Sequence, residues 1–70
     1  MKAEIIAVGT ELLMGELLDS NSTYLASELP TVGIELRLVY KVGDSIDDLT
    51  DAISSALNRS DFLFTTGGLG

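Results

Sequence analysis

The sequence contains no cysteine and no histidine, and it has a single proline. Without cysteine no disulfide can stabilise the chain, and without histidine neither imidazole catalysis nor histidine-ligated zinc is available within it. Any acid–base or metal chemistry carried by these 70 residues therefore uses carboxylates.

Basic residues are also few: four, against eleven acidic ones, for a net charge of −7. Lys2, Arg37, Lys41 and Arg59 are scattered along the sequence, so we expect no basic patch able to follow a phosphate backbone. The charge balance argues against nucleic acid as a partner.

No apolar run is long enough for a membrane span. The first fifteen residues, MKAEIIAVGTELLMG, carry one lysine, and Glu4 and Glu11 interrupt their apolar stretch. This pattern fits neither a signal peptide nor a transmembrane helix. We therefore expect no membrane association and a cytoplasmic location.

The remaining composition is that of a folded globular protein, with 46% hydrophobic residues, 21% charged residues and a mean hydropathy of +0.35. Seventy residues make at most one small domain. A chain of this size buries only about 60% of the surface that its unfolded form exposes, so we expect marginal stability.

Two segments have the apolar character of strands that are covered on both faces. In residues 3–9, Ala3, Ile5 and Ala7 share one face, whereas Ile6 and Val8 share the other. Residues 61–68 offer three consecutive apolar side chains at positions 62–64. Both segments are predicted to be interior strands.

Residues 34–42 alternate instead, as an edge strand does. The alternation places five side chains on one face, Ile34, Leu36, Leu38, Tyr40 and Val42, and leaves Glu35, Arg37, Val39 and Lys41 on the other.

Helical patterns separate the three strands. The first helix opens near residues 19–21, capped by Asp19 or Ser20, and Pro30 ends or kinks it near Leu29. Its apolar face is predicted to contain Leu25, Leu29 and Val32.

The second helix is the stronger prediction. Ser45 and Asp48 stand at capping-box spacing, and Arg59 stands near the negative end of the helix dipole. The apolar stripe is predicted to contain Ile46, Leu49, Ile53, Ala56 and Leu57.

The order β-α-β-α-β predicts an α/β fold: a three-layer, doubly wound parallel sheet with strand order 2-1-3. The chain direction across the sheet then reverses at the first strand, so a crevice opens between the carboxyl ends of strands one and three. Because residues 62–64 would make a poor exposed edge, we expect another strand beyond them. Residues 1–70 are thus predicted to be the N-terminal part of one domain that is incomplete at its C-terminus.

One wall of this crevice is the glycine-rich segment TTGGLG, residues 65–70. Glycines at this position can form a simple turn, or a cradle in which backbone N–H groups approach a phosphate without Cβ obstruction. The position after an interior strand favours the cradle. The segment is not a Walker A loop, and it does not complete a G-x-G-x-x-G fingerprint.

The other wall holds Thr10, Glu11, Asp19, Ser20 and Asn21. A structural explanation serves these residues equally well: Glu11 would be solvated, and residues 19–21 would cap a helix. Residues 42–49, VGDSIDDL, are interpreted mainly as a turn and a helix start, because they lack the oxygen-ligand spacing of an EF-hand.

The sequence resembles the N-terminal domain of the CinA (competence/damage-inducible) family, which has the molybdopterin-binding (MoaB/MogA-like) fold. Three segments together carry the resemblance: AEIIAVGTELLMGELLDSNSTYLASEL, VGDSIDDL and RSDFLFTTGGLG. The resemblance covers essentially the whole chain. It implies that Thr10, Glu11, Asp19 and Asn21 form the first wall of the ligand site, and Gly67, Gly68, Leu69 and Gly70 the second.

This resemblance implies binding and hydrolysis of nucleotide pyrophosphates of the ADP-ribose or FAD type, with a possible link to nicotinamide nucleotide metabolism. The catalytic candidates are Glu11 and Asp19, either of which could hold an ion or orient water. A magnesium-like divalent cation would offset ligand charge that this acidic chain cannot neutralise with its few basic residues.

Two alternatives stay open: a molybdopterin-binding module of molybdenum cofactor biosynthesis, and a non-catalytic oligomerisation or regulatory domain. The hydrolase would take a small-molecule nucleotide as its ligand, the module would take a pterin, and the non-catalytic domain would need no ligand. For all three functions we expect a homo-oligomer. We expect the 70 residues alone to be inactive.

Overall fold

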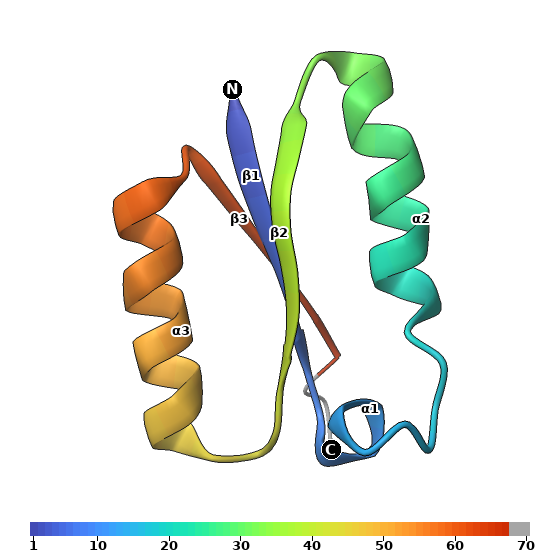
Figure 1. Ribbon diagram of the computed structural model, residues 1–70, viewed down its shortest axis with the longest axis vertical. Coiled ribbons are helices and arrows are strands. Elements are labelled where there is room, and N and C mark those ends of the chain that lie inside the picture. The colour runs from blue at the N-terminus through green and yellow to red at the C-terminus, as the bar shows by residue number, and fades with distance from the viewer. Residues whose placement is uncertain (68–70) are drawn as a thin grey trace.

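The computed structural model of the protein describes residues 1–67 (Figure 1). Strands and helices alternate along the chain, as the sequence predicts. The elements are β1 (Lys2–Val8), α1 (Thr10–Leu13), α2 (Ser20–Glu28), the 3-10 helix η1 (Leu29–Val32), β2 (Glu35–Val42), α3 (Ile46–Arg59) and β3 (Phe62–Gly67).

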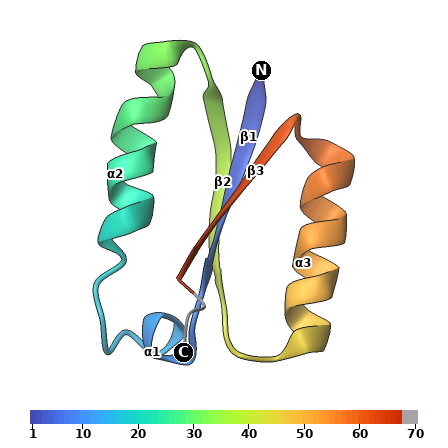
Figure 2. The same cartoon turned by 180° about the vertical axis from the view of Figure 1, so that it is seen from behind.

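The three strands form one parallel sheet in the order β2-β1-β3, which confirms the predicted topology. In Figure 2, the view from behind, β3 runs diagonally across the other two strands; it pairs with β1 on the side away from β2. The carboxyl ends of the strands are level, because Val8 of β1 pairs with both Val42 of β2 and Gly67 of β3. Any ligand at this end would meet all three strand ends at once.

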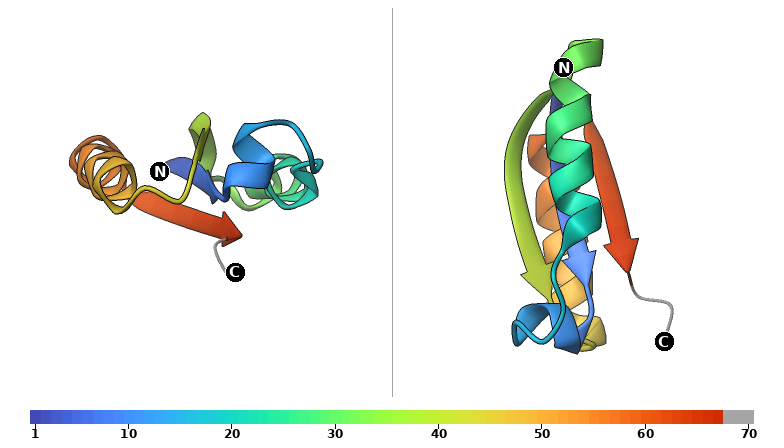
Figure 3. Two further views of the ribbon diagram at one scale, coloured as in Figure 1. Left: turned by 90° about the horizontal axis from the view of Figure 1, so that it is seen from below. Right: turned by 90° about the vertical axis from the view of Figure 1, so that its right-hand side faces the viewer.

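The two long helices cover opposite faces of the sheet, which gives three layers (Figure 3). On the α2 face, Ala3 and Ile5 of β1 pack with Leu29. On the α3 face, Ile6 packs with Val42 and Ala56. The prediction that β1 is apolar on both faces is therefore confirmed.

The prediction that residues 34–42 present a single apolar face is wrong. A β-bulge interrupts the pairing, because Ala3 pairs with Leu36 whereas the next residue, Glu4, pairs with Leu38. Arg37 is the extra residue, and it reverses which face the following side chains occupy. Ile34 and Leu36 consequently pack on the α2 face, whereas Tyr40 and Val42 pack on the α3 face.

The first predicted helix forms as α2, and its cap is Asp19, whose carboxylate accepts a hydrogen bond from the Ser22 N–H at 3.1 Å. Pro30 falls within the first turn of η1, so the α-helix ends where the proline predicts. Val32, however, is 71% exposed and does not belong to the core. A 3-10 helix turns by about 120° per residue, so the α-helical spacing no longer applies there.

The second predicted helix forms as α3, with the Ser45 hydroxyl accepting from the Asp48 N–H at 3.2 Å. Its predicted stripe is wrong at both ends, since Ile46 and Leu57 are exposed. The side chains that pack on the sheet are Leu49, Ala52, Ile53 and Ala56. Ala56 is fully buried, whereas Ile46 and Leu57 lie outside the contact between the helix and the sheet.

Within residues 1–67, β3 pairs only with β1, so it forms one edge of the described sheet and β2 forms the other. Phe62 at the start of β3 is exposed. The further strand expected beyond β3 stays a prediction. No helix of this part of the chain is long and apolar enough to cross a membrane.

Replacing Ile5 with alanine should lower the free energy of unfolding by about 3 kcal/mol, because Ile5 is fully buried and the cavity would be lined by rigid neighbours. The matched variant Val32→Ala should change it by less than about 0.5 kcal/mol. Denaturant unfolding of both variants measures this. A comparable loss at Val32 would mean that η1 packs as the α-helical spacing predicts.

Candidate functional site

The candidate site lies at the carboxyl edge of the sheet, where α1 follows β1 directly (Figure 1). The Gly9 N–H donates to the Val42 carbonyl oxygen at 2.8 Å, so the end of β1 stays joined to the end of β2. Thr10 and Glu11 then form the first turn of α1. Both side chains are exposed at this edge.

Thr10 is fixed by a residue that sequence reasoning did not select. Its hydroxyl donates to the Asp44 carboxylate at 2.9 Å. Asp44 follows β2, in the segment interpreted as mainly structural. Only the parallel pairing of β1 with β2 brings residues 10 and 44 together, and no local motif signals this contact.

Glu11 lies folded back over the start of its own helix. A Cβ placed on Gly9 would stand 2.7 Å from Glu11 Oε1, which locates this carboxylate directly against the end of β1. The backbone oxygen of Glu11 accepts from the N–H groups of Glu16 and Leu17, so the loop after α1 closes on the same residue. Glu11 thus offers an exposed carboxylate, and its backbone is fixed both by α1 and by the loop that follows α1.

Asp19 and Asn21 lie at the start of α2, as a second group. Asp19 serves as the helix cap, and its carbonyl oxygen also accepts from the Thr23 hydroxyl at 3.1 Å. Asn21 is exposed in the first turn. Among residues 1–67 no hydrogen bond joins this group to Thr10, Glu11 or Asp44.

Gly67 ends β3 with a backbone φ of +76°, a conformation that favours glycine. A Cβ here would stand 2.4 Å from the Val8 carbonyl oxygen, so Gly67 also permits close approach of β3 to β1. The other predicted loop residues, Gly68, Leu69 and Gly70, lie outside the described residues.

Two buried hydroxyl groups lie near this end of the sheet without a hydrogen-bond partner in the described part of the chain: Ser22 Oγ and Thr66 Oγ1. Thr66 pairs with Ala7 one residue before Gly67, and Ser22 lies in the first turn of α2. An unpaired buried hydroxyl costs about 1–3 kcal/mol, so water or a ligand atom is the expected partner. Sequence reasoning did not select Ser22, and its pattern gives no signal.

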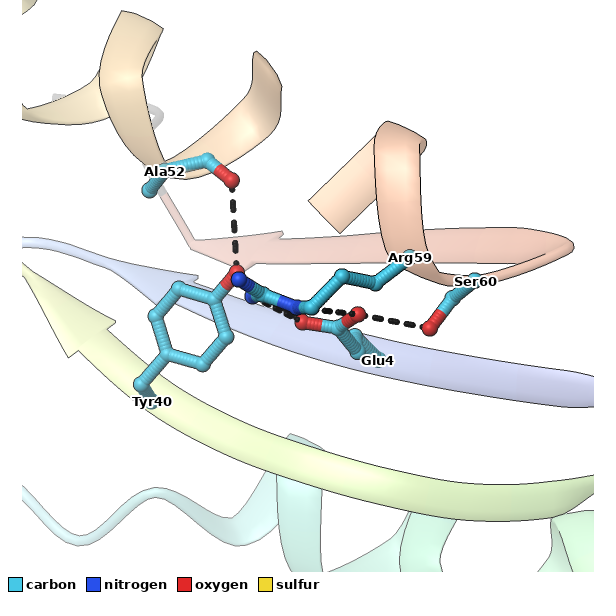
Figure 4. A network of polar contacts seen from close by, with 5 residues as sticks. All are labelled: Glu4, Tyr40, Ala52, Arg59 and Ser60. Atoms are coloured by element: carbon cyan, nitrogen blue, oxygen red, sulfur yellow. Dashed lines mark hydrogen bonds and ion pairs between the residues drawn. The ribbon is translucent and has the colours of Figure 1, made fainter. Parts of the chain in front are cut away.

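A second polar cluster lies on the α3 face and is centred on Glu4, which is 1% exposed (Figure 4). Arg59 Nη2 and Nε donate to the two Glu4 carboxylate oxygens at 2.7 and 3.3 Å. The Ser60 hydroxyl donates to Glu4 at 2.6 Å. The Tyr40 hydroxyl lies within hydrogen-bond distance of both Glu4 and the Ala52 carbonyl oxygen.

These contacts set the protonation of the cluster. The hydrogen bond from Arg59 holds the pKa of the Glu4 carboxyl below its ordinary value, against the opposing effect of burial. Burial, and then the negative charge of Glu4, raise the pKa of the Tyr40 hydroxyl. Glu4 is therefore ionised and Tyr40 neutral around pH 7.

In the sequence, Glu4 only interrupts an apolar run, and Arg59 only places a favourable charge near a helix end. A carboxylate between Ala3 and Ile5, in a strand apolar on both faces, does signal a required partner. Although they are scattered along the sequence, Lys2, Arg37 and Arg59 line one cavity in the structure. The expectation that no basic patch follows a phosphate backbone stays a prediction.

With the fold and the strand-end geometry described, comparison with known proteins defines the class. Residues 4–70 match the family described as "Probable molybdopterin binding domain", and the chain belongs to that family. Within it the chain is CinA-like: it is 51% identical over its whole length to a competence-damage inducible protein of Clostridioides difficile and 50% identical to a CinA-like protein of Kosmotoga olearia.

The solved structure of CinA from Thermoplasma acidophilum has the same fold, with a TM-score of 0.93 and 33% identity over the whole of this chain. The chain spans 17% of the length of the two curated relatives and 43% of the Thermoplasma chain. These comparisons confirm the resemblance on which the site residues were selected, and they leave the role of each residue to experiment.

Gly67 and Gly15 form a matched pair for testing the close approach of β3 to β1. Their φ angles are +76° and +78°, but a Cβ on Gly15 would meet nothing within 4 Å. Gly15→Ala should cost about 1 kcal/mol from backbone strain, and Gly67→Ala at least about 1 kcal/mol more, because it also contacts the Val8 carbonyl. Equal losses in denaturant unfolding would contradict the observed contact.

The lowered pKa of Glu4 makes stability depend on pH. A folded-state pKa below the ordinary value of 4.5 means that this stabilisation is present above about pH 4.5 and is lost as pH falls through the folded-state pKa. Glu4→Gln should lower the free energy of unfolding by about 1–2 kcal/mol at pH 7, a moderate loss because Arg59 is 50% exposed and can reach water.

Unfolding free energies measured between pH 7 and pH 3 test this. Glu4→Gln should flatten the decline below pH 4.5, whereas the control Glu28→Gln, at an exposed helix position, should keep the slope of the unsubstituted protein. An unaltered slope in Glu4→Gln would contradict the assignment.

Proposed function

We propose that the protein containing this chain binds and hydrolyses nucleotide pyrophosphates of the ADP-ribose or FAD type at the carboxyl edge of the sheet. One observation carries the proposal: Val8 pairs with both Val42 and Gly67. Gly67 therefore lies at the same edge of the sheet as the start of α1 and the turn that contains Asp44. Ligands of open α/β sheets bind where the direction of the chain reverses, here between β1 and β3.

In this proposal, backbone N–H groups of the glycine-rich residues 67–70 would bind the pyrophosphate, because glycine has no Cβ to obstruct the approach of a phosphate. Thr10 and Asp44 hold the opposite wall through their 2.9 Å hydrogen bond.

Of the two catalytic candidates, Glu11 suits the chemical step better. One oxygen of the Asp19 carboxylate is engaged as the α2 cap, whereas the Glu11 carboxylate is exposed at the strand ends. Glu11 would orient a water molecule toward phosphorus and accept its proton. The water oxygen forms the new P–O bond as the bridging P–O bond breaks, and the leaving phosphate group keeps the electron pair of the broken bond. ADP-ribose would thereby yield AMP and ribose 5-phosphate.

A divalent cation fits this edge only in part. Residues 1–67 contain no group of three or more carboxylates placed to hold a metal ion. Mg²⁺, however, is commonly bound by one or two carboxylates together with water and substrate phosphates, and Glu11 and Asp44 provide oxygen ligands of that type. Such an ion would neutralise phosphate charge for which this edge has few cations.

A molybdopterin-binding module is the second candidate, favoured by the description of the matching family. It would use the same edge to hold a pterin without turnover. A non-catalytic oligomerisation or regulatory role is the third. In all three we propose a cytoplasmic homo-oligomer with no nucleic-acid partner.

Hydrolysis of ADP-ribose and FAD by the full-length protein, with and without a metal chelator, tests the proposal. We expect turnover that the chelator abolishes. Glu11→Gln should lower kcat by about 100-fold or more, as loss of a general base does, whereas Glu16→Gln, an exposed neighbour on the loop after α1, should change it less than about twofold. Tight molybdopterin binding without turnover of either pyrophosphate would instead establish the module.

A further inference from the structure

We propose that the opposite end of the sheet carries a second ligand site, which binds a phosphate-class oxyanion. A cavity of about 240 Å³ lies there on the α3 face, lined by Lys2, Glu4, Arg37, Leu38, Arg59 and Ser60. Three of the four basic residues of the chain thus surround one cavity, although the net charge of the protein is −7. Neither α1 nor the described part of the glycine segment, residues 65–67, lines it.

Arg59 is held in position for such a ligand. Glu4 accepts from Nε and Nη2 of its guanidinium, and Nη2 also lies 3.5 Å from the Tyr40 hydroxyl (Figure 4). These contacts orient a planar group that has five N–H donors in total. Because the side chain is still 50% exposed, its remaining donors can reach an anion in the cavity.

The bulge in β2 shapes the opposite wall. Arg37 is the inserted residue, and as a result two consecutive side chains, Arg37 and Leu38, line the same cavity. An uninterrupted strand would direct them to opposite faces. Lys2 is two residues before Glu4 in β1, so it shares the face of Glu4. The fold therefore brings three cations together from three different elements.

The charge balance favours a small anion. Lys2, Arg37 and Arg59 against Glu4 leave two positive charges. Two exposed carboxylates are close to these cations but do not line the cavity: Glu35, 4.0 Å from Arg37, and Asp61, which accepts from the Lys2 backbone N–H. Water and salt weaken their effect, as they weaken that of the exposed Lys2 and Arg37. The carboxyl end of α3 adds partial negative charge, which Arg59 offsets. A polyanion would be repelled by the rest of this acidic chain, so we infer a free phosphate or a terminal phosphate group.

The test is calorimetric titration of the full-length protein with inorganic phosphate at constant ionic strength. The double variant Lys2→Ala/Arg37→Ala should bind phosphate at least about tenfold more weakly, since it removes two charge-assisted hydrogen-bond donors. The matched control is Lys41→Ala, which removes the one basic residue outside the cavity. It should change the affinity less than about twofold.

An affinity unchanged in the double variant would place the anion elsewhere, for example at the glycine segment, and would overturn the proposal. A loss of binding free energy in Lys41→Ala about half as large as in the double variant would reduce the effect to net charge, because the control removes one positive charge and the double variant two. That result would overturn the proposal, as would the absence of phosphate binding by the unsubstituted protein. If the double variant fails to fold, Leu38→Glu, which adds a carboxylate to the wall at a partly exposed position, should abolish phosphate binding; retained binding would refute the site.

Discussion

The structure depends on the burial of β1 on both faces. Each face of this strand needs its own apolar cover, so the chain places α2 on one side and α3 on the other. Each edge of β1 needs a hydrogen-bonded neighbour, which β2 and β3 provide. Because every other element contacts the sheet around this strand, the level of its ends also determines where polar groups from distant segments meet.

The two ends of the sheet carry different kinds of polar groups. At the carboxyl end, the strand ends meet a short helix, and the polar side chains are carboxylates and hydroxyls. At the amino end, cations gather around a buried carboxylate. The chain has few basic residues, and the fold places most of them away from the edge that the family resemblance selects. The two ends of the sheet therefore differ in the charge that their side chains offer to a ligand.

Much of this architecture could be predicted from sequence because its signals are local. The two-sided apolar pattern of β1, the Ser45 cap and the Asp19 cap each lie within a few consecutive residues, and each forms as predicted. Strand order followed from the same patterns, since the alternating strand had to lie at an edge.

The wrong predictions have a different cause. Each depends on a feature of the folded chain that the spacing of residues in the sequence does not indicate. The bulge at Arg37 changes the face of every later side chain in β2, and η1 changes the rotation per residue before Val32. Contacts between Thr10 and Asp44, or Glu4 and Arg59, join residues far apart in sequence and exist only once the strands pair. The sequence could predict which edge of the sheet holds the candidate site, but it could not predict which residues contact one another there.

The pairing of Glu4 with Arg59 also constrains the order in which the protein can form during synthesis. The two residues are 55 positions apart, so the central strand emerges from the ribosome long before its partner. Until Arg59 and Ser60 are available, burying Glu4 leaves a charge without compensation, which disfavours early docking of β1. Translation through the end of α3 is therefore the step that makes a closed core energetically accessible, and a nascent chain ending earlier would keep its first strand hydrated.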